Sequence, residues 1–164
     1  MENIELVRLT EIGRSELIEL MNNQLVRRQM PLFNGEFSSS DYEKFIVNKE
    51  QLWAKYGYGP WAFVVGNRFA GWGGLQPEQG EADLALVLHP DFWGLGKQLF
   101  KIIIRKAFTE MALNSITVLF PPTRSNVSAL LRLGFQKDSE LIINDHRFIR
   151  YRLLKPINEV GQIN

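Results

Sequence analysis

The sequence predicts a mixed α/β (α+β) fold, and three patterns indicate it. Apolar residues recur at helical spacing in the first third of the chain and again after Leu95. Short apolar runs bounded by glycine or proline, such as "WAFVV" and "SITVLF", have the length of buried strands. The predicted order is helices first, an antiparallel middle, one strand–helix–strand crossing and a closing hairpin, which is typical of a mixed domain.

The first third of the chain is expected to hold one strand and two helices. "ENIELVRL" alternates as a strand does, and Thr10 is placed to cap a helix. The apolar face of that helix consists of Leu17, Leu20 and Met21. "QMPLFNGEFSSS" breaks both periods and is expected to be a loop. Ser40 and Glu43 then have capping-box spacing for a second helix that ends at Gly57. Its apolar positions are Tyr42, Phe45, Ile46, Trp53 and Tyr56.

Three strands and a long helix are expected in the middle of the chain. "WAFVV" and "RFAGWGGL" are joined by Gly66-Asn67, a pair typical of a two-residue hairpin turn. "QPEQGE" is read as a connection to the strand "ADLALVL". From Leu95 onward the spacing predicts an amphipathic helix. Its apolar positions are Leu99, Phe100, Ile103, Ala107, Phe108 and Met111.

The last third is expected to hold a strand, a short helix and a hairpin. "SITVLF" is a buried strand that Pro121-Pro122 stops. A short helix over residues 125–133 ends at Gly134, a residue typical of helix C-termini. "FQKDSELIIN" and "HRFIRYRLL" then form two strands around an Asn144-Asp145 turn.

Length and composition fit one domain with an apolar core. The chain has 164 residues, of which 45% are hydrophobic and 23% charged. We expect a single domain over residues 1–156 and a disordered tail over 157–164. The absence of cysteine excludes disulfides, thiolate metal sites and cysteine nucleophiles.

The charge balance and the N-terminal residues limit the classes of partner. A formal net charge of +1 gives no electrostatic basis for binding nucleic acid or an anionic membrane. "MENIELVRLT" has no apolar core of a secretory signal, so we expect a cytoplasmic protein.

The stretch "HPDFWGLGKQLF" places two glycines where a helix is about to begin. A glycine-rich turn between a strand and a helix points backbone N–H groups at one spot, where the helix dipole adds positive charge. Gly94 and Gly96 would let a phosphate approach the backbone, with Lys97 at the rim. The alternative is that the glycines serve only a tight turn. The P-loop and dinucleotide-binding patterns do not match this spacing.

The segment "ADLALVLHPDFWGLGKQLF", followed later by "LLRLGF", resembles the GNAT superfamily of acetyl-CoA-dependent N-acyltransferases. The ordered elements resemble that family over nearly the whole chain. The "P-x-x-W-G-x-G" form is most similar to the branch that acetylates ribosomal proteins and other protein N-termini. The resemblance implies a central, twisted, mostly antiparallel sheet with flanking helices and a βαβ crossing that binds coenzyme A.

The resemblance also implies a coenzyme site. By its motif, the turn Trp93, Gly94, Leu95, Gly96, Lys97 and Gln98 holds the pyrophosphate. By the same comparison, Leu86, Val87 and Leu88 form the strand end that pairs with the pantetheine arm. Three further family positions fall at Thr123, Asn126 and Leu130.

The sequence departs from the family pattern at three places. Asp91 stands where the family has Gln or Arg, and it replaces a phosphate donor with a negative charge. Thr123 stands where many members have Asn, with Asn126 three residues later. Leu130 replaces the tyrosine that serves as general acid in many members.

Asp83 is our candidate for the general base. Its parity on "ADLALVL" matches Ala85 and Val87, and related enzymes often carry a carboxylate at this place. The alternative is a solvent-facing strand residue, and Glu81 on the same face is the substitute base. We interpret His89 as structural.

These observations predict an N-acetyltransferase that moves an acetyl group from acetyl-CoA to a primary amine by direct attack in a ternary complex. The amine is a protein N-terminus or a small molecule, the backbone N–H near Val87 or Leu88 meets the oxyanion, and no metal is needed. Trp61 and Trp72 could line the acceptor pocket or merely pack. We expect a monomer or homodimer. The alternative is a non-catalytic acyl-CoA-binding or interaction domain of the same fold.

Overall fold

The computed structural model describes residues 3–30, 33–124 and 127–156. The chain forms two compact units: the first consists of Met1–Leu75 and Leu86–Gly96, and the second of Gln76–Ala85 and Lys97–Asn164. The strands β3 (Arg68–Glu78) and β4 (Glu81–Leu88) each contribute to both units.

Seven strands are hydrogen-bonded to their neighbours in the order β1-β2-β3-β4-β5-β7-β6. The pairs β1–β2, β2–β3, β5–β7 and β6–β7 are antiparallel, whereas β4 and β5 are parallel. This open, mostly antiparallel sheet with one parallel crossing confirms the predicted fold class. No helix in the described ranges is long and apolar enough to cross a membrane.

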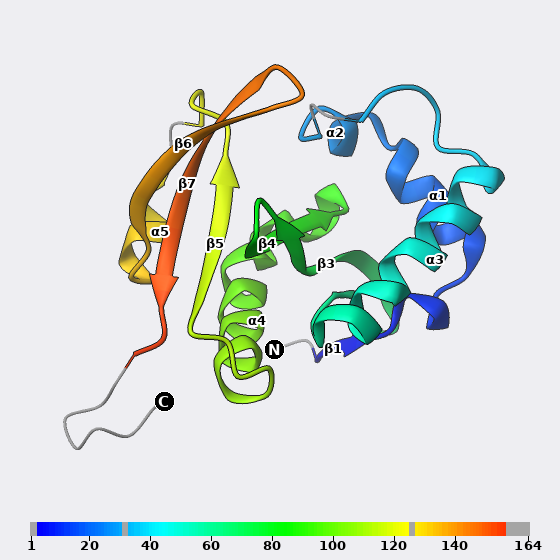
Figure 1. The fold of residues 1–164 in the computed structure, drawn as a ribbon. Coiled ribbons are helices and arrows are strands. Elements are labelled where there is room, and N and C mark those ends of the chain that lie inside the picture. The colour runs from blue at the N-terminus through cyan, green and yellow to red at the C-terminus, as the bar shows by residue number, and fades with distance from the viewer. Residues whose placement is uncertain (1–2, 31–32, 125–126, 157–164) are drawn as a thin grey trace. The chain divides into compact units, whose positions relative to one another are not determined.

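The first unit combines the N-terminal helices with the start of the sheet (Figure 1). Its elements before β3 are β1 (Ile4–Val7), the 3-10 turn η1 (Leu9–Glu11), α1 (Arg14–Asn22), α2 (Gln24–Arg27), α3 (Ser39–Tyr56) and β2 (Pro60–Val65). Gly66 and Asn67 have positive φ angles of 54° and 66°, which confirms the predicted hairpin turn between β2 and β3.

Two helix starts differ from the prediction. Thr10 lies within η1, and α1 begins only at Arg14, after Gly13, so Thr10 does not cap it. The capping box of α3 is Ser38 with Asp41: the Ser38 hydroxyl accepts the Asp41 N–H, and the Asp41 carboxylate accepts the Ser38 N–H. Three consecutive serines offered the same chemistry, and the helix uses the first of them.

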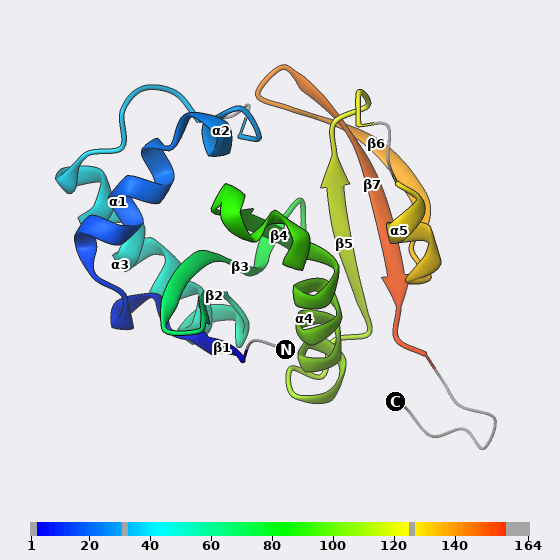
Figure 2. The ribbon, with the colours of Figure 1, turned by 180° about the vertical axis from the view of Figure 1, so that it is seen from behind.

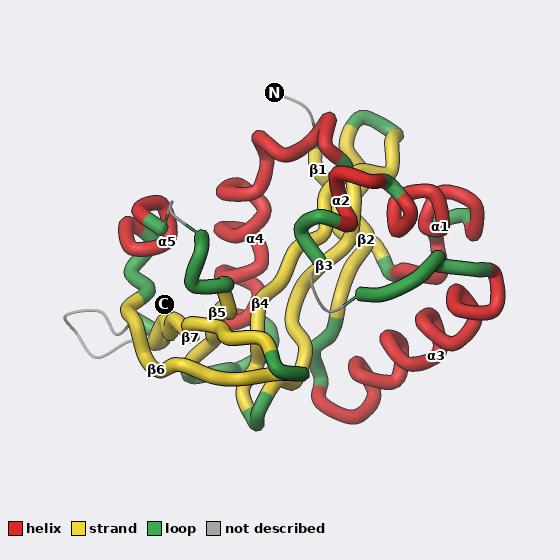
Figure 3. The backbone as a smooth tube through the Cα atoms, turned by 90° about the horizontal axis from the view of Figure 1, so that it is seen from above, coloured by secondary structure: helices red, strands yellow, loops and turns green. Residues whose placement is uncertain are grey.

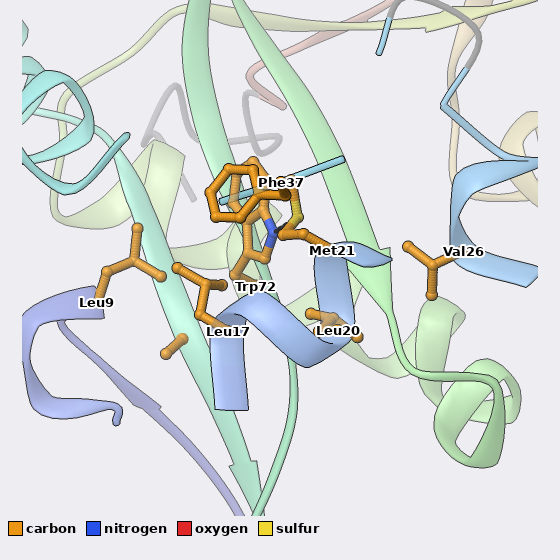
Figure 4. Packing of buried hydrophobic residues seen from close by; sticks show 8 residues of the cluster. Leu9, Leu17, Leu20, Met21, Val26, Phe37 and Trp72 are labelled. Carbon is orange, nitrogen blue, oxygen red and sulfur yellow. Dashed lines mark hydrogen bonds between the residues drawn. The ribbon is translucent and has the colours of Figure 1, made fainter. Parts of the chain in front are cut away.

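A hydrophobic cluster holds the first unit together (Figure 4). Its buried members are Leu9, Leu17, Leu20, Met21, Val26, Phe37, Ala62 and Trp72. Trp72 meets Phe45 edge-on with ring centroids 4.9 Å apart, and its indole N–H donates to the Met21 sulfur at 3.4 Å. Trp61 packs on Trp53, also at 4.9 Å. Both tryptophans therefore pack in the interior of this unit.

Gly71 allows β3 to approach the end of β4 closely. A Cβ at Gly71 would lie 2.2 Å from the Val87 carbonyl oxygen, and its φ of 151° disfavours any side chain. One residue beyond β4, the His89 N–H donates to the Ala70 carbonyl at 2.8 Å. This backbone packing fixes where β4 ends.

The second unit contains the strand–helix–strand crossing and the closing hairpin (Figures 1 and 2). After the first half of β4, its elements are α4 (Gly96–Thr109), β5 (Ser115–Phe120), α5 (Ser128–Arg132), β6 (Gln136–Ile143) and β7 (His146–Leu154). Asn144 and Asp145 have positive φ angles of 49° and 66°, as the predicted turn requires. In Figure 3, β6 and β7 run side by side as strands of one hairpin.

The sheet of the second unit has one apolar and one polar face. Ile116 and Val118 are buried, and Val118 lies opposite Tyr151 on the apolar face. On the other face, Thr117 lies opposite Arg152. Because side chains alternate along a strand, Asp83, Thr117, Arg150 and Arg152 share this polar face. The candidate base therefore lies among charged residues from three neighbouring strands.

Candidate active site

The turn after β4 is held by its own side chains. It consists of the 3-10 segment η2 (Pro90–Leu95), which leads directly into α4. The Nδ1 atom of His89 accepts the Asp91 N–H at 3.1 Å, so His89 caps the segment as a structural residue. The Trp93 indole N–H donates to the Leu88 carbonyl at 2.9 Å and fastens the turn to the strand end.

Gly94 and Gly96 are not required by the packing or by the backbone of the protein. A Cβ at either position would meet no atom within 4 Å, and neither residue has a left-handed φ. Gly71, by contrast, has both a steric and a conformational reason to be glycine. The fold itself would accept alanine at 94 and 96, so the open space over this backbone is available to a ligand.

The negative charge of Asp91 is balanced by Arg68 at the start of β3. The guanidinium lies 3.2 Å from the Asp91 carboxylate and 4.8 Å from the centre of the Phe92 ring. Phe92 is buried, so it gives the exposed arginine a fixed support. Sequence reasoning missed Arg68, because nothing in the chain links a residue after the Gly66-Asn67 turn to Asp91.

The remaining residues predicted for the coenzyme site are distributed over both units. Leu86 and Val87 are half-buried at the end of β4, and Leu88 is buried with its carbonyl occupied by Trp93. Lys97 and Gln98 are exposed in the first turn of α4.

The family positions in the second unit have different environments. Thr123 is exposed, whereas Leu130 is a buried residue of α5. Asn126 lies outside the described residues, as do the predicted start of that helix and the tail over 157–164.

Asp83 is a buried carboxyl group, not the solvent-facing residue that the alternative interpretation required. Its side chain is 3% exposed, and its Oδ1 accepts the hydroxyl of Thr117 on β5 at 2.9 Å. Burial raises the pKa of Asp83 to about 7, with a smaller increase from Glu78, while the Thr117 hydrogen bond and Arg150 lower it. This burial could not be seen in the sequence, because a covered polar face has the same alternating pattern as an exposed one.

Glu81 is committed to an ion pair and is a poor substitute base. Both of its carboxylate oxygens accept from Arg152, at 2.9 and 3.0 Å, which lowers the pKa of Glu81. Arg152 also donates to Asp138 at 3.1 Å and to Ser115 at 3.0 Å. Of the two carboxylates, Asp83 has the pKa suited to proton transfer near neutrality.

The two histidines have no catalytic surroundings. His146 is exposed at the final hairpin, where its Nδ1 contacts the Asn144 carbonyl. Among residues 3–30, 33–124 and 127–156, no three histidine, aspartate or glutamate side chains are grouped as metal ligands would be.

Comparison with known proteins identifies the class. The family model described as the acetyltransferase (GNAT) domain matches residues 3–136, most of the chain. The chain therefore belongs to the GNAT acetyltransferase family, and the protein is an acyltransferase enzyme of that type. The resemblance seen in the motifs is confirmed. A search of curated proteins found no match.

Solved acetyltransferases share the fold across nearly their whole length. The acetyltransferase from Agrobacterium tumefaciens strain C58 is 16% identical with a TM-score of 0.72, covering 92% of this chain and 90% of that one. The ribosomal-protein-S5-alanine acetyltransferase from Vibrio fischeri is 15% identical with a TM-score of 0.72, covering 93% and 92%. The dodecameric spermidine N-acetyltransferase from Vibrio cholerae is 15% identical with a TM-score of 0.65, covering 92% and 93%.

Proposed function

We propose that the protein transfers an acetyl group from acetyl-CoA to a primary amine by direct attack in a ternary complex. The observation that carries this proposal is the bare backbone at Gly94 and Gly96, which neither packing nor φ explains. A pyrophosphate that lies against backbone N–H groups at the start of a helix gives both glycines a reason. We further expect a cytoplasmic monomer or homodimer.

The turn and the strand end would divide the coenzyme between them. The backbone of residues 93–98 would hold the pyrophosphate, and the exposed Lys97 would add a positive charge at its rim. Since Arg68 neutralises Asp91, the turn does not present a net negative charge to the phosphates. The Leu88 carbonyl is occupied, so the pantetheine arm would pair with Leu86 and Val87. Thr123, Asn126 and Leu130 stay predictions for this site.

Asp83 would remove the proton that makes the amine a nucleophile. An alkyl ammonium has a pKa of about 10, so the reaction needs a base that is ionised near neutrality. The pKa of Asp83, raised to about 7 by burial, meets that requirement. Because only 3% of its side chain is exposed, we expect an ordered water to carry the proton to it.

The acyl transfer itself needs a stabilised oxyanion and a leaving thiolate. The amine nitrogen attacks the thioester carbonyl carbon, the C–N bond forms, and collapse of the tetrahedral intermediate breaks the C–S bond. A backbone N–H near Val87 or Leu88 would donate to the oxyanion. Leu130 cannot donate a proton, so the thiolate, with a parent pKa of about 8.5, would take its proton from solvent.

The test is thioester consumption with a panel of amines, for the parent protein and for Asp83→Ala. Protein N-terminal peptides and small amines both belong in the panel, because both acceptor classes remain candidates. We expect turnover by the parent and a loss of about a hundredfold or more in kcat for Asp83→Ala. Unchanged turnover would remove Asp83 from the mechanism. Acetyl-CoA binding without turnover of any amine would favour a non-catalytic binding domain.

A further inference from the structure

Arg150 on β7 is a buried guanidinium without a carboxylate partner among the described residues. Its side chain is 6% exposed, and its Nη2 donates to the Glu78 backbone carbonyl at 2.9 Å. Its Nε is buried and has no hydrogen-bond partner in the described part of the chain. A buried cation in this state is unfavourable unless an anion compensates its charge.

The neighbouring carboxylates are already engaged elsewhere. Arg152, two residues along β7, binds both Glu81 and Asp138. Asp83 accepts from Thr117. Within the described part of the second unit, no carboxylate lies within ion-pair distance of Arg150. The strand thus carries one arginine with a complete set of partners and one whose donors point to a missing group.

The open donors of Arg150 have the geometry of a carboxylate-binding fork. The Nε–H and the second Nη2–H lie on the same edge of the planar guanidinium and can donate in parallel to two oxygens. We propose that Arg150 binds the carboxylate of the acceptor, so that the acceptor is a small amino-acid-like amine carrying both an ammonium and a carboxylate group. This inference rests on the proposed acetyl transfer to an amine.

The position of Arg150 relative to the candidate base supports a zwitterionic acceptor. Asp83 on β4 lies opposite Thr117 on β5, and Arg150 on β7 lies opposite Leu119, two residues along β5 on the same face. The positive charge of Arg150 also lowers the pKa of Asp83, so the two groups interact electrostatically. An acceptor between them would place its ammonium toward Asp83 and its carboxylate toward Arg150.

The burial of Arg150 favours a small acceptor over a protein chain. A group that reaches a guanidinium 6% exposed must itself be largely enclosed, which suits a free amino acid. A peptide that presents an acidic side chain is the competing acceptor, and the experiment includes it.

The experiment compares matched amines that differ only by a carboxylate: ethylamine with β-alanine, propylamine with 4-aminobutyrate, and phenethylamine with phenylalanine. We expect kcat/KM to be higher by about a hundredfold or more for the carboxylate member of at least one pair. Arg150→Met should abolish that preference, and Arg150→Lys should retain part of it. Both should leave the KM for acetyl-CoA unchanged. Arg147→Gln is the matched control, because Arg147 lies on the same strand, is 68% exposed and pairs with Glu140.

Several results would overturn the inference. Turnover of amines without a carboxylate preference would do so, as would a preference that survives in Arg150→Met. Preference for peptides that begin with Asp or Glu over free amino acids would contradict the small acceptor. If no amine is acetylated, the proposed function fails, and the inference is then judged by NMR.

The NMR measurement requires neither turnover nor a folded variant. The Nε–H resonance of Arg150 in the parent protein should shift on titration with β-alanine or 4-aminobutyrate, and not with the matched amines. No shift with any carboxylate would overturn the proposal.

Discussion

Replacing Asp83 with asparagine should make the protein more stable at pH 8 while it removes the candidate base. Asparagine is nearly the same size, and its carbonyl oxygen can still accept the Thr117 hydroxyl. The parent protein must keep a carboxyl group buried at 3% exposure, where its charged form is disfavoured. The amide of the variant carries no such charge, so Asp83→Asn should relieve this destabilisation.

The size of the effect follows from the pKa of Asp83. In the unfolded chain the carboxyl ionises at its ordinary pKa of 3.8, whereas in the folded protein its pKa is about 7. Between these values the folded state binds more protons than the unfolded state, so stability falls as pH rises from about 4 to about 7. This loss amounts to about 1.5 kcal/mol at pH 5 and about 4 kcal/mol at pH 8.

Urea unfolding of the parent and of Asp83→Asn at pH 5 and pH 8 measures this directly. The stability advantage of the variant should widen by about 2 to 3 kcal/mol between the two pH values. Asp138→Asn is the control: Arg152 lowers the pKa of Asp138, so this variant should be less stable than the parent by the same amount at both. An advantage of Asp83→Asn that does not change with pH would refute the buried, raised-pKa carboxyl.

Two further predictions separate ligand binding from folding. Gly94→Ala should leave the melting temperature within about 1 °C of the parent, because its Cβ meets open space, whereas Gly71→Ala should cost about 3 kcal/mol or more through contact with the Val87 carbonyl and its φ of 151°. Equal melting temperatures for the two variants would show that the turn and strand are packed differently. Arg68→Ala should weaken acetyl-CoA binding by about three- to tenfold at low salt, and Asp91→Asn in the same chain should restore it. If the double variant binds no better than Arg68→Ala, charge balance at the turn is not the role of Arg68.

The sequence alone was sufficient for the sheet, the hairpins and the family. "SITVLF" matches β5 at both ends, because β-branched residues and flanking prolines define a buried strand without tertiary help. The turns at Gly66-Asn67 and Asn144-Asp145 were predictable because their positive φ angles select these residue types. Helix starts were less certain, as Ser38 and Ser40 differ only in tertiary context.

The electrostatic arrangement of the site could not be predicted from sequence. The burial of Asp83, the engagement of Glu81 by Arg152 and the unpartnered Nε of Arg150 within the described residues all depend on strands far apart in the chain. Alternation along β4 and β7 places these side chains on a face, but it does not reveal whether that face is covered. Only the register of β4, β5 and β7 relates them to one another.

The most direct test of the account is a calorimetric titration of acetyl-CoA into the parent protein, into Gly94→Glu and into Gln51→Glu. Gln51 is exposed on α3, so Gln51→Glu adds the same charge away from the turn. We expect saturable binding by the parent and by Gln51→Glu, and none by Gly94→Glu, which keeps its melting temperature. Undiminished binding by Gly94→Glu, or no binding by the parent at millimolar acetyl-CoA, would contradict a coenzyme site at this turn.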